Sequence, residues 1–222
     1  MKVACIGNEA QQQEWSTQVT QLSATDHEAK EKAAPLSMEW LTHPRALTDQ
    51  TICFDFLYND DATHQADLVA FQQKGGIVVV NAVLETSQSL PAGFVRINAW
   101  PGFLANQRLE MVCKDVTTQN QLCNVLRQID RVPEWVPDQI GFIALRVICS
   151  IINEAYIALG EGVSDKKQID LAMQLGTNYP LGPFAWAEKI GKKRVLSLLK
   201  KLSEESSRYS PAALIEQEAN AN

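Results

Sequence analysis

Apolar residues in the first half of the chain gather in short runs rich in β-branched and aromatic side chains, a pattern typical of buried strands. These runs cover residues 3–6, 51–57, 77–83, 94–100 and 109–112. Between some of them the apolar positions take a helical spacing, over 62–73 and 118–129. Strands that alternate with helices predict a mostly parallel sheet covered by helices.

Residues 24–44 interrupt this order. The charged run 26–32 is typical of an exposed helix, whereas 38–41 has the composition of a short strand. The pattern leaves the topology of this segment open.

From Gly141 onward the pattern is helical throughout. We expect Ser164 to cap the second of these helices and Gly176 to end it. Further helices are expected over 183–190 and 192–203, and from Pro211. The predicted fold is α/β followed by all-α: a reduced Rossmann-like domain over 1–136 and a helical domain over 137–222. The first helix of the second domain carries an apolar stripe formed by Ile148, Ile151, Ile152, Ala155 and Leu159.

Composition excludes several classes of protein. The net charge of −6 argues against nucleic-acid and anionic-membrane partners, because phosphate binding depends on clustered Lys and Arg. The longest apolar stretch, 141–159, contains Arg146 and Glu154, so it predicts a core helix rather than a membrane span. The five cysteines form no C-x-x-C pair, and no metal site is expected. No targeting segment is visible, and we expect a cytoplasmic protein.

Three motifs follow one another in the second half of the chain. They are Asp138-Gln-Ile-Gly-Phe-Ile-Ala-Leu-Arg, Ile152-Asn-Glu-Ala-Tyr and Ile169-Asp-Leu-Ala-Met-Gln-Leu-Gly-Thr-Asn-Tyr-Pro-Leu-Gly-Pro. This series resembles the C-terminal domain of 3-hydroxyacyl-CoA dehydrogenases. The resemblance implies an N-terminal NAD-binding domain, and a helical domain that completes the acyl-CoA cleft and forms the dimer interface.

The turn after the first strand departs from the nucleotide-binding pattern. A dinucleotide fold needs G-x-G-x-x-G there, because side chains at the later glycines block the pyrophosphate and the helix packing. The run here is Gly7-Asn-Glu-Ala-Gln-Gln, in which Glu9 adds a carboxylate where phosphate should bind. By resemblance, Gly7 and Asn81 are the cofactor-binding candidates. We expect no cofactor, or NAD if the family's activity is retained.

The catalytic motif departs as well. The family uses a histidine base oriented by a glutamate, in H-F-F-N-P followed by L-V-E-V. Here the segments are Ile97-Asn-Ala-Trp-Pro and Leu109-Glu-Met-Val. Glu110 matches the glutamate, and the histidine position falls on Ile97 or Asn98 depending on the anchor of the alignment. Neither side chain accepts a proton at neutral pH. The candidate catalytic residues are Glu110 and Asn98.

By the same resemblance, two further positions are apolar where the family has polar residues. Val83 stands where the family has a serine that contacts the substrate, and Leu145 stands where it has an asparagine that faces the active site. His27, His43 and His64 lie in polar stretches, and we expect them at the surface.

The leading hypothesis is therefore a catalytically degenerate family member that serves as a binding or assembly partner. One alternative is an active NAD-dependent 3-hydroxyacyl-CoA oxidoreductase of fatty-acid metabolism. Another is a binder of acyl-CoA or an apolar ligand without turnover. The expected partners are a second copy, bound through the C-terminal helical domain, an acyl-CoA ligand, or an active relative.

Overall fold

The computed structural model describes residues 1–17, 36–59 and 61–221. These residues form two compact units, Met1–Gln139 and Ile140–Asn222. Each unit is described by itself.

The first unit is built on a sheet whose described strands follow the order β2-β1-β3-β4-β5-β6-β7. All neighbouring strands are parallel except β5 and β6. The predicted mostly parallel sheet is thereby confirmed. The strands are β1 (Lys2–Ile6), β2 (Ser37–Leu41), β3 (Ile52–Asp55), β4 (Ile77–Val80), β5 (Val95–Ile97), β6 (Arg108–Val112) and β7 (Val132–Trp135).

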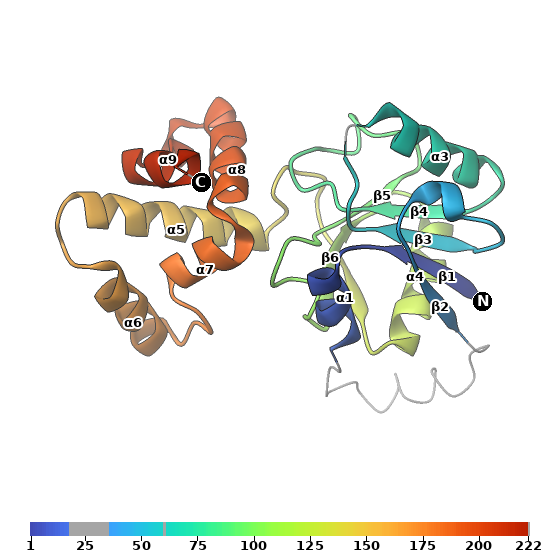
Figure 1. Cartoon of the computed structure of the whole chain (residues 1–222), viewed down its shortest axis with the longest axis horizontal. Coiled ribbons are helices and arrows are strands. Elements are labelled where there is room, and N and C mark those ends of the chain that lie inside the picture. The colour runs from blue at the N-terminus through green and yellow to red at the C-terminus, as the bar shows by residue number, and fades with distance from the viewer. Residues whose placement is uncertain (18–35, 60, 222) are drawn as a thin grey trace. The chain divides into compact units, whose positions relative to one another are not determined.

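Helices cover both faces of this sheet (Figure 1). The helices are α1 (Glu9–Ser16), α3 (Ala62–Gln73) and α4 (Val116–Gln128), with a short 3-10 helix, η1 (Pro44–Ala46). On one face, Trp15 of α1 and Leu122 of α4 join the core with Val3 and Phe54. On the other face, Leu68 and Phe71 of α3 pack on Ile6 and Cys53. The alternation of strand side chains between the two faces produces these two cores.

Several strands are shorter than their apolar runs. The run 51–57 ends as a strand at Asp55, because the Asp55 carboxylate accepts a hydrogen bond from the Leu57 backbone N–H at 3.0 Å and turns the chain. The sequence left the topology of residues 24–44 open. Of this segment, 38–41 lies in β2, whereas the charged run 26–32 lies outside the described residues. The sequence did not predict β7, an edge strand that contains Pro133, a residue tolerated at sheet edges.

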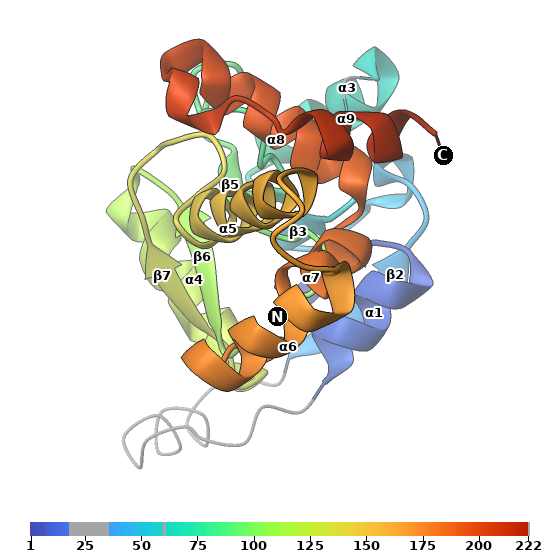
Figure 2. The ribbon, with the colours of Figure 1, turned by 90° about the vertical axis from the view of Figure 1, so that its left-hand side faces the viewer.

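The second unit consists of helices (Figures 1 and 2). The long helix α5 packs against α7, α8 and α9, while α6 packs mainly on α7. The expected all-helical part is confirmed. No helix within the described residues is long and apolar enough to cross a membrane. The helices are α5 (Ala144–Gly160), α6 (Lys166–Thr177), α7 (Pro183–Ile190), α8 (Lys192–Glu205), η2 (Ser207–Tyr209) and α9 (Ala213–Asn220).

The predicted ends of α6 were wrong by one and two residues. Asp165, not Ser164, is the N-cap, and its carboxylate accepts from the Gln168 backbone N–H at 2.9 Å. The helix runs through Gly176 to Thr177, and its C-cap is Asn178, which takes the left-handed conformation (φ 57°). Asn reaches this conformation more readily than most residues, so a glycine is not required there.

Candidate functional site

The turn after β1 ends in a closed capping box at the start of α1. The Asn8 side chain accepts from the Gln11 backbone N–H at 3.0 Å, and the Gln11 side chain accepts from the Asn8 backbone N–H at 3.0 Å. The Gln11 amide also donates to the Phe56 carbonyl, at 3.0 Å, and is buried. In dinucleotide folds, backbone N–H groups at this helix start bind the pyrophosphate. Here two of them are bonded to the protein's own side chains.

Gly7 is surrounded by other side chains. A Cβ atom at this position would lie 2.9 Å from Trp40, 3.3 Å from Phe56 and 3.3 Å from the Gln11 amide oxygen. Two aromatic rings and an amide therefore use the space that the missing side chain leaves. These surroundings favour a packing role for Gly7, and its cofactor role stays a prediction.

Asn81 directly follows β4 and links two neighbouring strand ends. Its amide nitrogen donates to the Phe56 carbonyl at 3.2 Å, and its oxygen accepts from the Ala99 backbone N–H at 3.1 Å. Both ends of the Asn81 amide are thus bonded within the protein. Its assignment to cofactor binding remains a prediction.

Asn98 and Glu110 lie together. Asn98 comes directly after β5, and its backbone N–H pairs with the Glu110 carbonyl on β6 at 3.0 Å. The Asn98 amide donates to the Glu110 carboxylate at 3.0 Å, and Asn98 is only 2% exposed. Ile97 belongs to the hydrophobic core and is fully buried. The residue beside the glutamate is therefore Asn98 rather than Ile97.

Arg131 fixes the loop that follows β5 and was not singled out from the sequence. The side chain is fully buried, and burial lowers the pKa of its guanidinium. It donates to the backbone carbonyls of Glu14, Trp15 and Thr17 at the end of α1, and to that of Ala105 in the loop, at 3.0 to 3.3 Å. Arg131 thereby joins α1 to the segment that begins at Asn98. Its sequence neighbours carry no signal of this contact, since all four partners are backbone atoms distant in the chain.

Two further buried or half-buried side chains hold the loops at this edge. The Glu14 carboxylate accepts from the Gly102 backbone N–H at 2.7 Å. Arg96, fully buried, pairs with Asp138 at 2.6 Å and donates to the Ala82 carbonyl at 3.0 Å. Burial raises the pKa of Asp138, but hydrogen bonds from Ser87 and Arg96 outweigh it, so this pKa lies below its ordinary value. These contacts bond the loops at the carboxyl edge of the sheet to one another.

One expectation about the histidines was wrong. His64 is 6% exposed and bonds through Nε2 to the fully buried carboxylate of Asp55. A buried aspartate at the end of β3 needs a partner, which explains why His64 leaves the surface. His43 is partly exposed, and His27 lies outside the described residues. Val83, which replaces the family's serine, is 2% exposed.

A mostly parallel sheet with helices on both faces, followed by a helical unit, defines a Rossmann-like domain followed by an all-helical domain. A family model described as "3-hydroxyacyl-CoA dehydrogenase, C-terminal domain" matches residues 141–222. The chain is 33% identical over 149 residues to 3-hydroxyadipyl-CoA dehydrogenase of Escherichia coli (strain K12), covering 64% of this chain and 31% of that protein. It is 36% identical over 98 residues to 3-hydroxybutyryl-CoA dehydrogenase of Clostridioides difficile, covering 43% of this chain and 35% of the relative.

Among solved structures, the fold is similar to that of (S)-3-hydroxybutyryl-CoA dehydrogenase PaaH1 from Ralstonia eutropha. The TM-score is 0.72 at 22% identity, over 99% of this chain and 93% of that one. The chain is therefore similar to 3-hydroxyacyl-CoA dehydrogenases, and its residues 141–222 match the C-terminal domain of that family. The matched region spans only about a third of the length of the two curated relatives.

Proposed function

We propose that this chain keeps the fold of its family without the NAD-linked reaction, and that it serves as a binding or assembly partner. The observation that carries the proposal is the closed hydrogen bonding at the carboxyl edge. Asn8 and Gln11 satisfy each other at the start of α1, and Asn81 is bonded at both ends of its amide. A ligand that needs these groups would have to break protein contacts first.

The residues at the start of α1 do not fit a dinucleotide in its usual pose. The buried Gln11 side chain occupies the helix start, and the exposed Glu9 adds a negative charge to the first turn. Two like charges about 4 Å apart repel by roughly 1 kcal/mol in water and more near a protein surface. Both effects oppose a pyrophosphate at this position.

The pair Asn98–Glu110 supports the same conclusion. It keeps the geometry in which a glutamate orients its neighbour, since the two side chains are 3.0 Å apart. An amide nitrogen, however, donates protons and does not accept one at neutral pH. Loss of a general base costs a factor of about 10² to 10⁴ in rate. The Asn98 side chain can bind and orient a ligand, but it cannot take a hydroxyl proton as a histidine base does.

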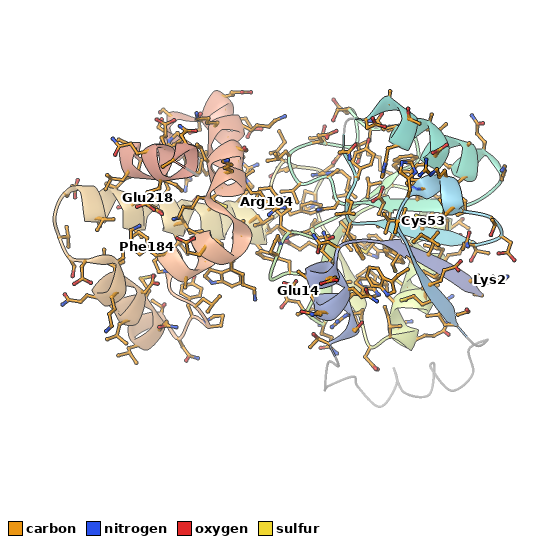
Figure 3. The ribbon with its side chains drawn as sticks, in the orientation of Figure 1. Lys2, Glu14, Cys53, Phe184, Arg194 and Glu218 are labelled. Carbon is orange, nitrogen blue, oxygen red and sulfur yellow. The ribbon has the colours of Figure 1, made fainter. Side chains whose placement is uncertain are left out.

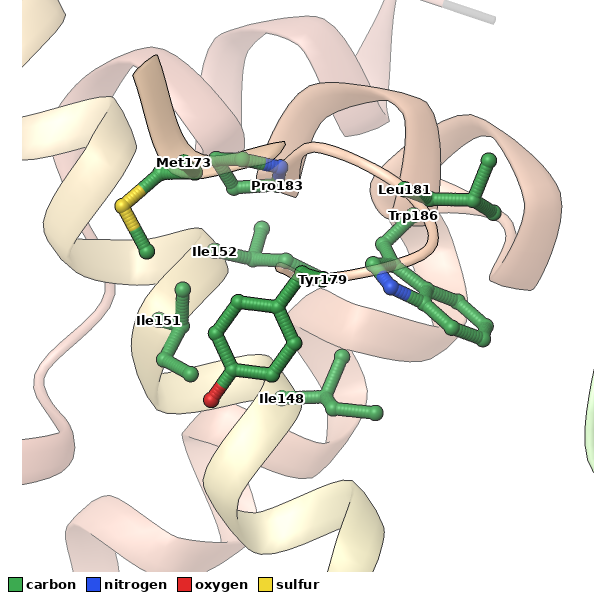
Figure 4. A pocket seen from close by; sticks show the side chains of 8 residues that line it. All are labelled: Ile148, Ile151, Ile152, Met173, Tyr179, Leu181, Pro183 and Trp186. Carbon is green, nitrogen blue, oxygen red and sulfur yellow. The ribbon is translucent and has the colours of Figure 1, made fainter. Parts of the chain in front are cut away.

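The partner we propose is a second copy, bound through the helical unit. None of the residues of α6 is buried, and its Leu171 and Leu175 are 52% and 79% exposed. A neighbouring apolar hollow is lined by Tyr179 and Trp186 with side chains of α5 and α6 (Figure 4). Exposed apolar surface of this extent is typical of interaction sites. An acyl-CoA ligand or an active relative are the other partners that the experiments below distinguish.

The assay that tests the proposal is NADH oxidation with acetoacetyl-CoA at high protein concentration. The wild-type chain is compared with an Asn98→Ala, Glu110→Ala double variant. A contaminating dehydrogenase would be present in both preparations and would give the same rate in both. We expect no turnover above that of the double variant, and no NADH binding by calorimetry at millimolar ligand. Turnover that the double variant abolishes would show an active NAD-dependent oxidoreductase. Calorimetric binding of acetoacetyl-CoA without turnover would favour the ligand-binding alternative.

A further inference from the structure

Two histidines lie side by side at the carboxyl edge of the first unit. His43 follows β2 and is the N-cap of η1, while His64 lies in the first turn of α3. Their ring centroids are 5.2 Å apart, and the rings meet edge-on at 66°. Two imidazoles this close influence each other's charge, because like charges repel at this distance.

His64 is held in place by Asp55. The hydrogen bond that His64 donates to Asp55 raises the pKa of His64, against the lowering effect of burial. The stabilisation from the charged imidazole is therefore present below its ordinary pKa and is lost as the pH rises through the raised one. His64 can donate through Nε2 to Asp55 in its neutral and in its charged form, so the member of the pair whose bonding must change on protonation is His43.

One atom of His43 serves two partners that need opposite protonation states. Its Nδ1 accepts the Arg45 backbone N–H at 3.2 Å and so caps η1. The same Nδ1 lies 3.6 Å from the Asp67 carboxylate of α3. Without a proton, Nδ1 can accept from Arg45 but is no donor to Asp67. With a proton it can donate to Asp67 but no longer accepts from Arg45.

We propose that His43 is a pH-sensitive latch: protonation of its Nδ1 releases the cap on η1 and transfers the ring to Asp67. Below the transition, η1 loses the side-chain hydrogen bond at its start and keeps only its backbone bonds, from Ala46 to His43 and from Leu47 to Pro44. The latch lies outside the candidate site and is independent of the proposed function.

The charged groups around the latch explain its direction. Asp67 of α3 supplies negative charge to His43, while Asp55 of β3 and Asp61, the N-cap of α3, supply it to the neighbouring His64. A charged His64, and Arg45 two residues along the chain, oppose a further positive charge. Tyr58 meets the His64 ring at 6.5 Å. Asp67 is the carboxylate that lies beside Nδ1 of His43, so it accepts the hydrogen bond of the protonated ring.

Release of the cap acts on the packing of α3. The 3-10 helix η1 contacts α3, and Leu47 directly after it packs on the core beneath α3. The segment 43–47 therefore borders the carboxyl edge of β2 and is the part that loosens when His43 is charged.

The test is an NMR titration from pH 8 to pH 5 that follows the Arg45 amide and the imidazole protons. We expect the Arg45 amide shift to follow His43 titration, and its exchange protection factor, corrected for intrinsic rates, to fall about fivefold, as for loss of an N-cap. The matched variant is His43→Asn, which keeps a capping oxygen and has no titrating group. In this variant the Arg45 amide should stay unchanged across the range.

Two further variants test the partners. Asp67→Asn removes the acceptor of the protonated state and should move the transition to lower pH. His64→Gln keeps a donor to Asp55 but removes its positive charge, and should move the transition to higher pH. An Arg45 amide that titrates in His43→Asn as in the wild type, or that ignores His43 titration in the wild type, would overturn the proposal.

Discussion

Asn98 and Glu110 are held together by one side-chain and one backbone hydrogen bond. The Asn98 amide fills the place next to the glutamate, and the backbone pair between the two strands holds it there. The contact is preserved, but the proton-accepting nitrogen of a histidine is absent. An amide in this contact with Glu110 therefore cannot do the proton transfer that a histidine could do in the same place.

The capping box of α1 was readable in part from the sequence. Asn8 followed three residues later by Gln11 is the spacing of a capping box, in which each side chain bonds the other's backbone. The loss of the later glycines was visible as well. The bond from Gln11 to the Phe56 carbonyl was not, because the two residues are 45 positions apart and meet only through the pairing of β1 with β3.

Arg131 supplies the residue-scale prediction. Replacement of Arg131 by Met removes the buried donor from the backbone carbonyls of Glu14, Trp15, Thr17 and Ala105. Each lost hydrogen bond costs about 1 kcal/mol or more. We expect the first unit to lose on the order of 3 kcal/mol of unfolding free energy, measured by urea denaturation.

The control for Arg131 is Arg108→Met. Arg108 pairs with Glu134 at 2.8 Å, but its side chain is 72% exposed, so its removal should cost less than about 1 kcal/mol. Equal effects of the two substitutions would mean that Arg131 does not anchor the loop.

At the scale of elements, α9 is fastened to the second unit by Glu218 (Figure 3). Its carboxylate accepts from Tyr156 at 2.9 Å and pairs with Lys166 and with Lys192, the latter at 3.1 Å. These three partners come from α5, α6 and α8. The Glu218 side chain thus joins four helices. The acidic composition of the C-terminal sequence did not predict these contacts.

Glu218→Gln tests this anchor. Burial raises the pKa of Glu218, but hydrogen bonds from Lys166, Tyr156 and Lys192 lower it by more. The pKa of Glu218 therefore lies below its ordinary value of 4.5. The carboxylate's contribution is present above that ordinary value and is lost as the pH falls through the lowered one. At neutral pH we expect a loss on the order of 2 kcal/mol, seen as a lower thermal midpoint of the helical unit.

The difference between Glu218→Gln and the wild type should shrink as the pH falls below about 4. Glu216→Gln is the matched control, since Glu216 forms only an exposed pair with Lys200 at 3.2 Å. A pH-independent difference would assign the effect to packing rather than to charge.

At the scale of the whole molecule, the exposed apolar side of α6 leads to a prediction about assembly. Leu175 is 79% exposed, so Leu175→Glu leaves folding intact but places a charge in the proposed contact. We expect the wild type to sediment as a dimer at micromolar concentration and the variant to dissociate with a constant raised at least about tenfold.

Val116→Glu is the control for assembly. Val116 is 65% exposed and starts α4 in the first unit, away from α6 in the chain. Its variant should sediment as the wild type does. A wild type that is monomeric, or two variants that behave alike, would remove α6 from the interface and direct attention to an active relative as the partner.

The sequence by itself determined the α/β and all-helical parts, because period-2 and period-3.6 apolar spacing are local properties that burial enforces on every strand and helix. It also determined that the turn after the first strand reads Gly7-Asn-Glu-Ala-Gln-Gln and that the segment 97–101 holds no histidine, since these are identities at single positions. Tertiary structure alone decided between Ile97 and Asn98, since strand pairing with β6 sets which residue meets Glu110. It alone decided the burial of His64 and the roles of Arg131 and Glu218. The partners of Arg131 and Glu218 are far away in the chain, and Asp55 and His64, nine positions apart, meet only because α3 packs on the sheet beside β3.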